Sequence, residues 1–430
     1  MSFELDDESH VEFFRTLVKV KDGERYVVGR PDTRTFVELP EVGAQAITLL
    51  QKGLSVREVQ EELKNRFEKE FDVKSFIQEL LSSGFVKSIE GQAVTGVPVE
   101  GQIFEVKGER KRLLKIKGEH VKWLFSRPFL GGFFAPLITA GIIIMLLNPS
   151  YWPKPQDLLF HESLTLVLLG LYGISFILLF LHEIAHLFAA MPLGVQGSIR
   201  LSNRLFYIVF ETDLTNLWMV PRKKRYPAYL AGLIIDITVI STFTILMWRS
   251  DIKVLGGSGG IFYGLAKAAI FLELLRVAWQ FMFFMKTDIY HLFADYFKCK
   301  NLYGDTINYI TNKLMKLFGK SDRQKDMSFI PENEMRVIRK YALFFLAGTA
   351  ISLFLYAFLI IPLTAIILIS TTQHLLSGYV GNEAAFIDSI VIISLMALNF
   401  ILLGYSLWKK SRLVFRRKTA KSLREPTLKE

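Results

Sequence analysis

Long apolar stretches separated by basic loops constrain the fold of this chain more than any other feature. Of its 430 residues, 51% are hydrophobic, and six stretches are long enough to cross a bilayer as helices. They cover about residues 128–148, 164–190, 226–248, 260–285, 342–370 and 385–407. Inside lipid the backbone must satisfy its own hydrogen bonds, so each stretch is expected to be helical. The sequence therefore predicts a mainly α-helical, polytopic membrane protein with a bundle of about six spans.

The loops differ sharply in their content of basic residues. Lys and Arg gather before the first span, after the second, after the fourth and after the sixth. The alternate loops hold at most two each, and residues 371–384 hold none. Cytoplasmic loops are enriched in Lys and Arg, so both termini are predicted to be cytoplasmic. Because most basic residues flank spans, the net charge of +11 indicates the lipid bilayer as a partner and weighs against nucleic acid.

The second apolar stretch contains the sequence His182-Glu183-Ile184-Ala185-His186. On a helix the two histidines lie four residues apart on one face, so both can bind one metal ion. Ionisable side chains are costly inside a membrane and are usually retained there for function. We therefore predict a zinc site with His182 and His186 as ligands and Glu183 as the catalytic general base. With the predicted orientation, His182 lies ~12 Å of helix rise from the cytoplasmic end of its span.

Catalytic zinc usually has three protein ligands, so one more is expected near the same end of the bundle. The fourth span also ends on the cytoplasmic side, and Asp288 follows it at a similar membrane depth. Asp288 is the predicted third ligand, and His291, one turn further on, is the alternative. Glu273 and Arg276 in the fourth span are three residues apart and are predicted to form a structural ion pair.

These motifs resemble the site-2 protease family of intramembrane zinc metalloproteases, in its peptide-maturation branch. In that family the two histidines and the glutamate lie on one core helix, and the third ligand is an Asp two core helices later. The segment Lys286–Asp295 is similar to the family's LDGYY…SD stretch, and Ala231-Gly232 to its Ala-Gly-Pro. Leu233 stands in place of that proline, and Ile289 in place of the glycine after the Asp. The resemblance covers roughly residues 164–305 and implies Zn²⁺ as the cofactor.

Residues 196–220 connect the second and third spans and include the run LFYIVFETD. Its β-branched and aromatic residues predict a strand or hairpin. The family resemblance implies a strand-forming segment beside the active site, where an open edge can hold an extended peptide by strand addition. An ordinary amphipathic segment at the membrane interface is the alternative.

Residues 24–92 have the pattern of a small soluble α+β domain with a winged-helix-like order. The predicted elements are a hairpin around Pro31-Asp32, a helix over residues 43–52, a second helix opened by a capping box at Ser55 and Glu58, a third capped by Asp72 and ended by Gly84, and a strand over residues 85–89. This order resembles PqqD-like peptide-recognition domains, which bind leader segments of ribosomally made, modified peptides. One alternative is contact with DNA, and the acidic residues of the second helix weigh against it. The other is a generic cytoplasmic interaction domain.

Five parts are thus predicted: an N-terminal segment (1–23), the PqqD-like domain (24–92), a charged linker (93–127), the six-span metalloprotease domain (128–407) and a basic cytoplasmic tail (408–430). The predicted function is cleavage of a membrane-associated or hydrophobic peptide in a bacterial cell membrane, with the leader of a modified-peptide precursor bound to the N-terminal domain. One alternative is a regulated intramembrane protease acting on a membrane-anchored signalling protein. The other is a non-proteolytic protein that binds or exports a peptide and holds a structural metal.

Overall fold

The structure is a computed structural model that describes residues 5–33, 35–94, 118–195, 197–204, 207–250, 260–328 and 330–422. It divides the chain into two compact units. The first comprises Met1–Lys122, Ala190–Ser198 and Asp213–Pro227, and the second comprises Trp123–Ala189, Ile199–Thr212 and Ala228–Glu430. Residues 95–117 of the predicted linker lie outside the described residues, and so do residues 423–430 of the predicted tail. Several of the basic residues on which the predicted membrane orientation depends belong to those two segments.

Residues 5–94 of the first unit contain three helices and six short strands. The helices are α1 (Glu41–Gln51), α2 (Val56–Phe67) and α3 (Val73–Ser82), and the strands are β1 (Val11–Phe13), β2 (Val18–Asp22), β3 (Arg25–Arg30), β4 (Thr35–Leu39), β5 (Val86–Ile89) and β6 (Gln92–Ala93). Antiparallel pairing joins them into two three-stranded sheets, β1-β5-β6 and β2-β3-β4. Buried side chains such as Val28, Ile47, Leu63 and Ile77 form one hydrophobic core between these elements.

The local signals read from the sequence of this unit are confirmed. Strands β3 and β4 form the predicted hairpin, in which Arg30 lies opposite Thr35. The Ser55 side chain accepts from the Glu58 backbone N–H while Glu58 accepts from the Ser55 N–H, which is the predicted capping box. Asp72 caps α3 through the Ser75 N–H. Strands β1 and β2 lie in the first 23 residues, where no element was predicted.

A buried ionic cluster joins β2 to the start of α8 (Arg222–Ser250) within the first unit. The Asp22 carboxylate accepts from the backbone N–H of Arg222 at 3.1 Å and pairs with its guanidinium Nε at 3.2 Å. The Arg225 guanidinium lies 3.6 Å from the same carboxylate and is fully buried. Asp22 thus caps the N-terminus of α8, where an anion is favourable.

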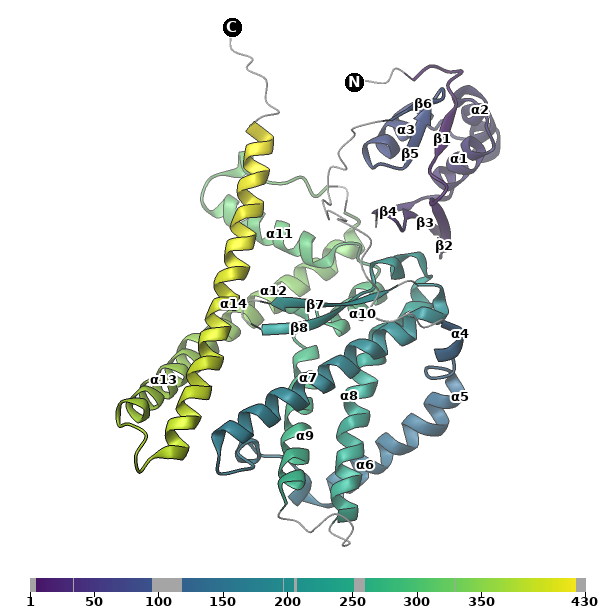
Figure 1. Ribbon diagram of the computed structural model, residues 1–430. Helices are drawn as coiled ribbons and strands as arrows, with labels where there is room; N and C mark the ends of the chain where they lie inside the picture. The colour runs from purple at the N-terminus through teal and green to yellow at the C-terminus, as the bar shows by residue number, and fades with distance from the viewer. Residues whose placement is uncertain are drawn as a thin grey trace. The chain divides into compact units, whose positions relative to one another are not determined.

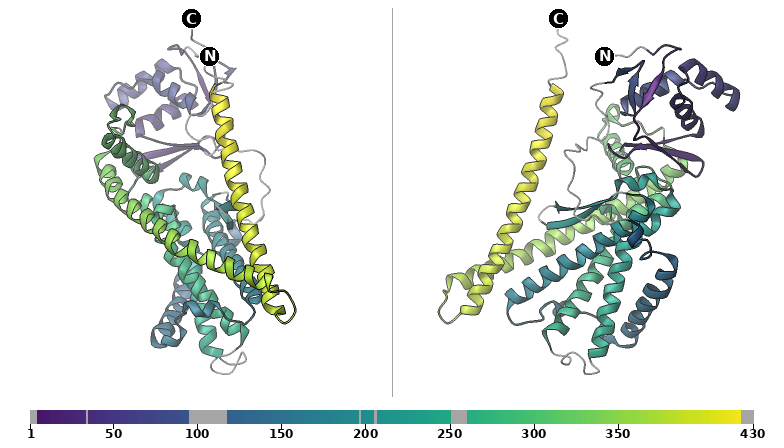
Figure 2. Two further views of the ribbon diagram at one scale, coloured as in Figure 1. Left: turned by 90° about the vertical axis from the view of Figure 1, so that its left-hand side faces the viewer. Right: turned by 45° about the vertical axis from the view of Figure 1, so that its right-hand side comes forward.

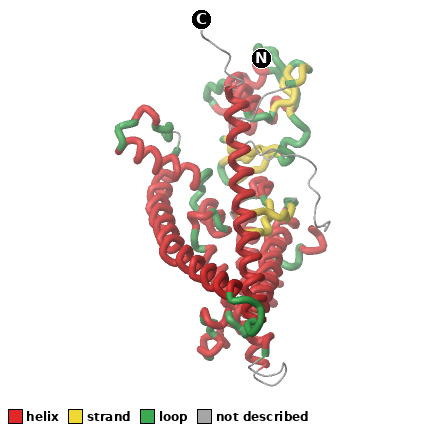
Figure 3. The backbone as a smooth tube through the Cα atoms, turned by 60° about the vertical axis from the view of Figure 1, so that its left-hand side comes forward, coloured by secondary structure: helices red, strands yellow, loops and turns green. Residues whose placement is uncertain are grey.

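Helices make up most of the second unit. The helices before α8 are α5 (Arg127–Phe129), which continues through η1 (Leu130–Phe134) into α6 (Ala135–Leu147), and α7 (Leu164–Ala190). The helical elements after α8 are α9 (Ile261–Gln280), η6 (Phe283–Met285), α10 (Asp288–Tyr296), α11 (Leu302–Leu317), α12 (Glu332–Leu355), η8 (Tyr356–Ile360), α13 (Ile361–Leu376) and α14 (Glu383–Ser422). Figure 1 shows α6, α7, α8 and α9 side by side. Figure 3 shows α12, η8 and α13 as one long, bent helical segment followed by α14.

Among the described residues, five helical segments are long and apolar enough to cross a membrane. They are Arg127–Leu147, Leu164–Leu193, Arg222–Arg249, Glu332–Leu376 and Glu383–Tyr405. The chain is therefore a mainly helical protein of membrane type with a small N-terminal sheet region. Helix α9, which coincides with the predicted fourth span, contains Lys267, Glu273 and Arg276 and is not one of these five. Its crossing of the membrane stays a prediction.

Close contacts hold the helices of the second unit together. A Cβ added to Gly141 of α6 would lie 2.4 Å from the Cβ of Ser241 in α8, so only glycine allows this approach. Helices α13 and α14 form an antiparallel hairpin (Figure 2). Asp388 of α14 accepts hydrogen bonds from the backbone N–H groups of Leu164 and Thr165, both at 2.9 Å. This carboxylate caps α7 and fixes the start of the helix that carries the two histidines.

The segment between α7 and α8 contains the predicted strand. Strands β7 (Ser198–Arg204) and β8 (Tyr207–Asp213) form a two-stranded sheet. The hydroxyl of Thr212, near the end of β8, donates to the backbone carbonyl of Glu183 in α7 at 2.8 Å. The strand therefore ends beside the histidine helix.

Candidate metal centre

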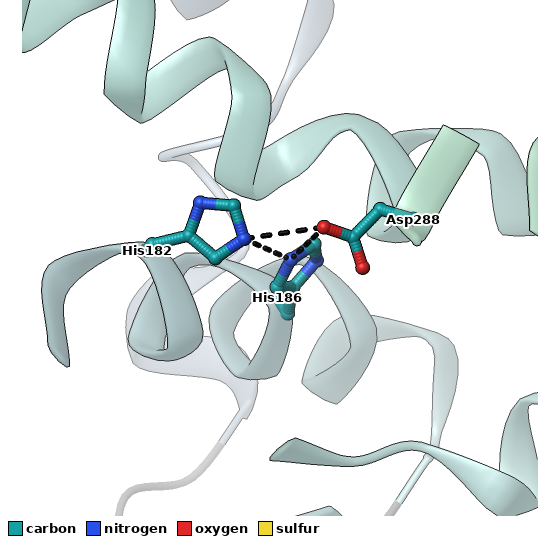
Figure 4. A group of neighbouring side chains, drawn as sticks. All are labelled: His182, His186 and Asp288. Atoms are coloured by element: carbon teal, nitrogen blue, oxygen red, sulfur yellow. Dashed lines mark hydrogen bonds and ion pairs between the residues drawn. The ribbon is translucent and has the colours of Figure 1, made fainter. Parts of the chain in front are cut away.

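Three predicted ligands, His182, His186 and Asp288, meet in the second unit (Figure 4). The two imidazole Nε2 atoms lie 3.1 Å apart, and each lies 3.2 Å from Oδ2 of Asp288. Both histidines are buried, with 4% and 3% of their surface exposed. His182 and Asp288 are 106 positions apart in the chain, yet their ligand atoms lie side by side with that of His186.

The partners of the two Nδ1 atoms determine what the Nε2 atoms can do. Nδ1 of His186 faces the backbone carbonyl of Ala228 at 2.7 Å, and a carbonyl can only accept, so this nitrogen carries a proton. Nδ1 of His182 faces the Asp236 carboxylate at 2.9 Å and donates in the same way. In a neutral imidazole the other nitrogen is then an acceptor. With both imidazoles neutral, the two Nε2 atoms and Asp288 Oδ2 are three acceptors directed at one point, an arrangement that suits a cation.

Both the spacing of these atoms and their surroundings fit a zinc ion. Ligands 2.0–2.2 Å from a tetrahedral ion lie about 3.3 Å from one another, close to the observed separations. Gly232 of α8 leaves the necessary room, because a Cβ there would lie 2.4 Å from Cε1 of His182 and 2.5 Å from Nε2 of each histidine. Three protein ligands also leave a coordination position open, as in catalytic rather than structural zinc sites.

A turn between η6 and α10 brings Asp288 to the histidines. Lys286 adopts a left-handed conformation (φ 56°) that reverses the chain, and its ammonium lies over the Tyr303 ring at 4.1 Å. Gln280, at the end of α9, then fixes Asp288 on both sides. Its amide nitrogen donates to Asp288 Oδ2 at 2.8 Å, and its amide oxygen accepts from the Asp288 backbone N–H at 3.1 Å.

His291, the alternative third ligand, lies outside this group of donors. Its ring stacks on Tyr229, with the ring centroids 5.9 Å apart, and burial lowers its pKa. The Tyr229 hydroxyl contacts the carboxylate of Asp295 at 3.1 Å. His291 and Asp295 thus belong to the packing between α8 and α10 rather than to the donor cluster.

Behind His182 lies a chain of charged side chains from α8 and α9. The Asp236 carboxylate that accepts from His182 lies 3.7 Å from the Arg276 guanidinium, which in turn lies 3.1 Å from Glu273. Asp236 and Glu273 are both buried, with at most 1% of their surface exposed. The ion pair predicted for Glu273 and Arg276 is therefore confirmed, and Asp236 joins it to His182, a candidate metal ligand. Partners of this kind orient a ligating histidine and strengthen its binding to a metal.

Glu183 lies on α7 directly after His182 and faces the end of β8. Its Oε2 accepts from the backbone N–H of Thr212 at 2.8 Å. This bond fixes the carboxylate and shows that the edge of β8 carrying the Thr212 N–H faces the glutamate. The Glu183 carboxylate and a strand edge thus lie beside the helix that carries the two candidate histidine ligands.

Comparison of the chain with family models, with curated proteins and with solved structures gave no match. The function must therefore be inferred from the site itself.

Proposed function

We propose that this chain is a six-span intramembrane zinc metalloendopeptidase that resembles the site-2 proteases. The observation that carries the proposal is the convergence of His182 Nε2, His186 Nε2 and Asp288 Oδ2 with both Nδ1 atoms already bound to acceptors. These three residues would hold the zinc. Glu183, fixed beside them by Thr212, supports catalysis over a purely structural metal.

When bound, zinc would polarise the scissile carbonyl and make a water molecule a better nucleophile. Glu183 would take the proton of the attacking water on its carboxylate and deliver it to the leaving amine. The β8 edge that faces Glu183 would hold the substrate in extended form by backbone pairing. Such an interaction suits a peptide that enters from the membrane as a helix, because a helix hides its backbone amides.

We further propose that the protein lies in a bacterial cell membrane with both termini in the cytoplasm and with α9 as the fourth of six spans. The first unit would act as a winged-helix-like, PqqD-like domain, a reading supported by its three helices and the β1-β5-β6 sheet. It would bind the leader of a ribosomally made, modified peptide. The peptide released by cleavage would then be a maturation product of that precursor.

The decisive experiment compares the full-length protein with the Glu183→Gln variant on precursor peptides. Zinc content should be equal in the two proteins, because the substituted position is not a predicted ligand, while cleavage should fall by at least a hundredfold. A chelator should stop cleavage by the unmodified protein, and zinc should restore it. Full cleavage by the variant would contradict the mechanism. Zinc binding without any cleavage in either protein would favour a peptide-binding or export protein with a structural metal.

A second comparison tests the third ligand against its neighbour on the same helix. Asp288→Ala is expected to lower the zinc content of the purified protein, because it removes a direct donor. His291→Ala is the matched control, since His291 also lies on α10 but outside the donor cluster. Equal zinc loss in the two variants would show that general damage to α10, rather than loss of a ligand, explains the result.

A further inference from the structure

A cavity of about 500 Å³ lies between η6, α10 and α12, apart from the metal centre. Its lining consists of five aromatic residues, one valine, one asparagine and two basic residues: Phe283, Phe293, Phe297, Tyr341, Phe344, Val337, Asn333, Arg336 and Lys340. The volume is in the range of small-molecule binding sites.

The aromatic residues form a continuous apolar floor. Phe283 packs on Phe293 and Phe344, with ring centroids 5.7 Å and 5.4 Å apart, and Phe293 packs on Phe297 at 4.5 Å. Phe297 and Phe344 remain 40% and 41% exposed. Apolar groups such as acyl chains that cover these rings would lower the free energy by removing apolar surface from water.

The rim of the cavity is cationic and has no acidic residue. Arg336 and Lys340 lie one helical turn apart on the same face of α12. Neither forms an ion pair with any residue that the structure describes, whereas Arg339, on the same helix, pairs with Glu332 at 3.3 Å. Glu334, the nearest acid in sequence, is buried and accepts from the backbone N–H of Lys300. The rim therefore offers two cationic side chains to an anion.

The position of the cavity along α12 identifies the class of the ligand. The helix opens the apolar segment Glu332–Leu376, and Arg336 and Lys340 lie in its first three turns. Directly beyond them Leu343 and Leu346 are exposed, at 72% and 49%, as side chains facing lipid would be. The cavity thus lies where a charged boundary meets an apolar surface. Phospholipid headgroups occupy this level, and basic pockets there recognise anionic lipids.

We propose that this cavity binds one anionic phospholipid, with its phosphate on Arg336 and Lys340 and an acyl chain on the aromatic floor. The lipid would also support the segment that presents Asp288. Phe283 belongs to η6 and Phe293 to α10, the two elements on either side of the Lys286 turn. Moreover, the Tyr341 hydroxyl donates to the Phe283 carbonyl at 2.9 Å, which joins the cavity wall to that segment.

The test measures lipid binding and does not depend on proteolysis. Full-length protein is stripped of lipid in detergent and titrated with phosphatidylglycerol or phosphatidylcholine, and bound copies are counted by native mass spectrometry. Phosphatidylglycerol should bind one tight copy and phosphatidylcholine should not. Each basic residue near a membrane surface contributes about fivefold to such binding, so Arg336→Gln with Lys340→Gln should weaken it about thirtyfold. Val337→Trp, which fills the cavity and leaves its charge unchanged, should abolish the tight copy.

Arg339→Gln is the matched control, because it removes a basic residue of the same helix that does not line the cavity. An equal loss of lipid in this variant would overturn the proposal in favour of general surface attraction. Equal binding of the two lipids, or an unchanged tight copy in the double variant, would also overturn it. The proposal would also be wrong if inorganic phosphate displaced the lipid with an affinity equal to that of the lipid. It would be wrong as well if the cavity bound an acidic, apolar peptide and no lipid.

Discussion

Replacing Gly232 by alanine is expected to abolish zinc binding while leaving the fold intact. The added methyl carbon would lie 2.4 Å from Cε1 of His182 and 2.5 Å from Nε2 of both histidines. Carbon atoms rest about 3.5 Å from their neighbours, so the two rings would have to retreat by about 1 Å. Metal sites tolerate ligand displacements of only about 0.2 Å. Loss of an outer hydrogen-bond partner alone weakens zinc binding about 10- to 100-fold, so moving two ligands should cost more than a hundredfold.

Zinc content of the purified protein, measured by plasma mass spectrometry, and zinc affinity, measured by competition with a chromophoric chelator, test this prediction. The matched control is Gly173→Ala on α7, where a Cβ would meet nothing within 4 Å. Alanine favours a helix over glycine by about 1 kcal/mol, so this control should bind zinc normally and be no less stable. Circular dichroism and thermal unfolding report the fold of both variants. Normal zinc affinity in a folded Gly232→Ala protein would refute the site geometry.

Three further predictions concern the residues around the ligands and the first unit. Asp236→Asn should weaken zinc binding about 10- to 100-fold, because the His182 Nδ1–H loses a charged acceptor; an unchanged affinity would remove Asp236 from the site. Gln280→Leu should weaken it about tenfold, because Asp288 loses the amide donor that orients it, and an equal affinity would show that the turn alone positions Asp288. In the first unit, the hydrogen bond from Ser75 lowers the pKa of Asp72. Its stabilising contribution is therefore complete above about pH 4 and is lost as the pH falls through the lowered pKa. Thermal unfolding from pH 6 to pH 3 should show a smaller acid-side loss in Asp72→Ala, and identical profiles would contradict this assignment.

The parts of the site that follow a simple rule along the chain could be predicted from the sequence. His182 and His186 share a face because four residues make about one helical turn, whatever surrounds the helix. Asp288 was found from membrane depth, since it follows the end of a span that runs in the same predicted direction as the histidine helix. The capping box at Ser55 and the cap at Asp72 are equally local, because each depends on atoms three residues away.

Contacts between distant elements carry no comparable signal. Gln280 orients Asp288 only because the Lys286 turn brings the two residues together. A single Gln at the end of an apolar helix does not predict this contact. The Thr212 N–H reaches Glu183 through the path of β8, which no spacing rule encodes. Strand β2 is a different case. Its alternation of valine and lysine over residues 18–21 is a typical strand signal, but the run is too short to predict a strand by itself.

The charges that set α9 apart from the five apolar helices have partners within the second unit, and this supports the proposal that α9 is the fourth of six spans. Lys267 lies 3.5 Å from Asp157, and Arg276 lies near both Glu273 and Asp236. A charge inside lipid is tolerated where it faces the bundle and is paired. Arg276 also lies beside Asp236, whose carboxylate contacts the candidate ligand His182. Two of the three charged residues that lower the hydropathy of α9, Glu273 and Arg276, thus belong to the ionic network behind His182, while Lys267 pairs elsewhere in the same unit.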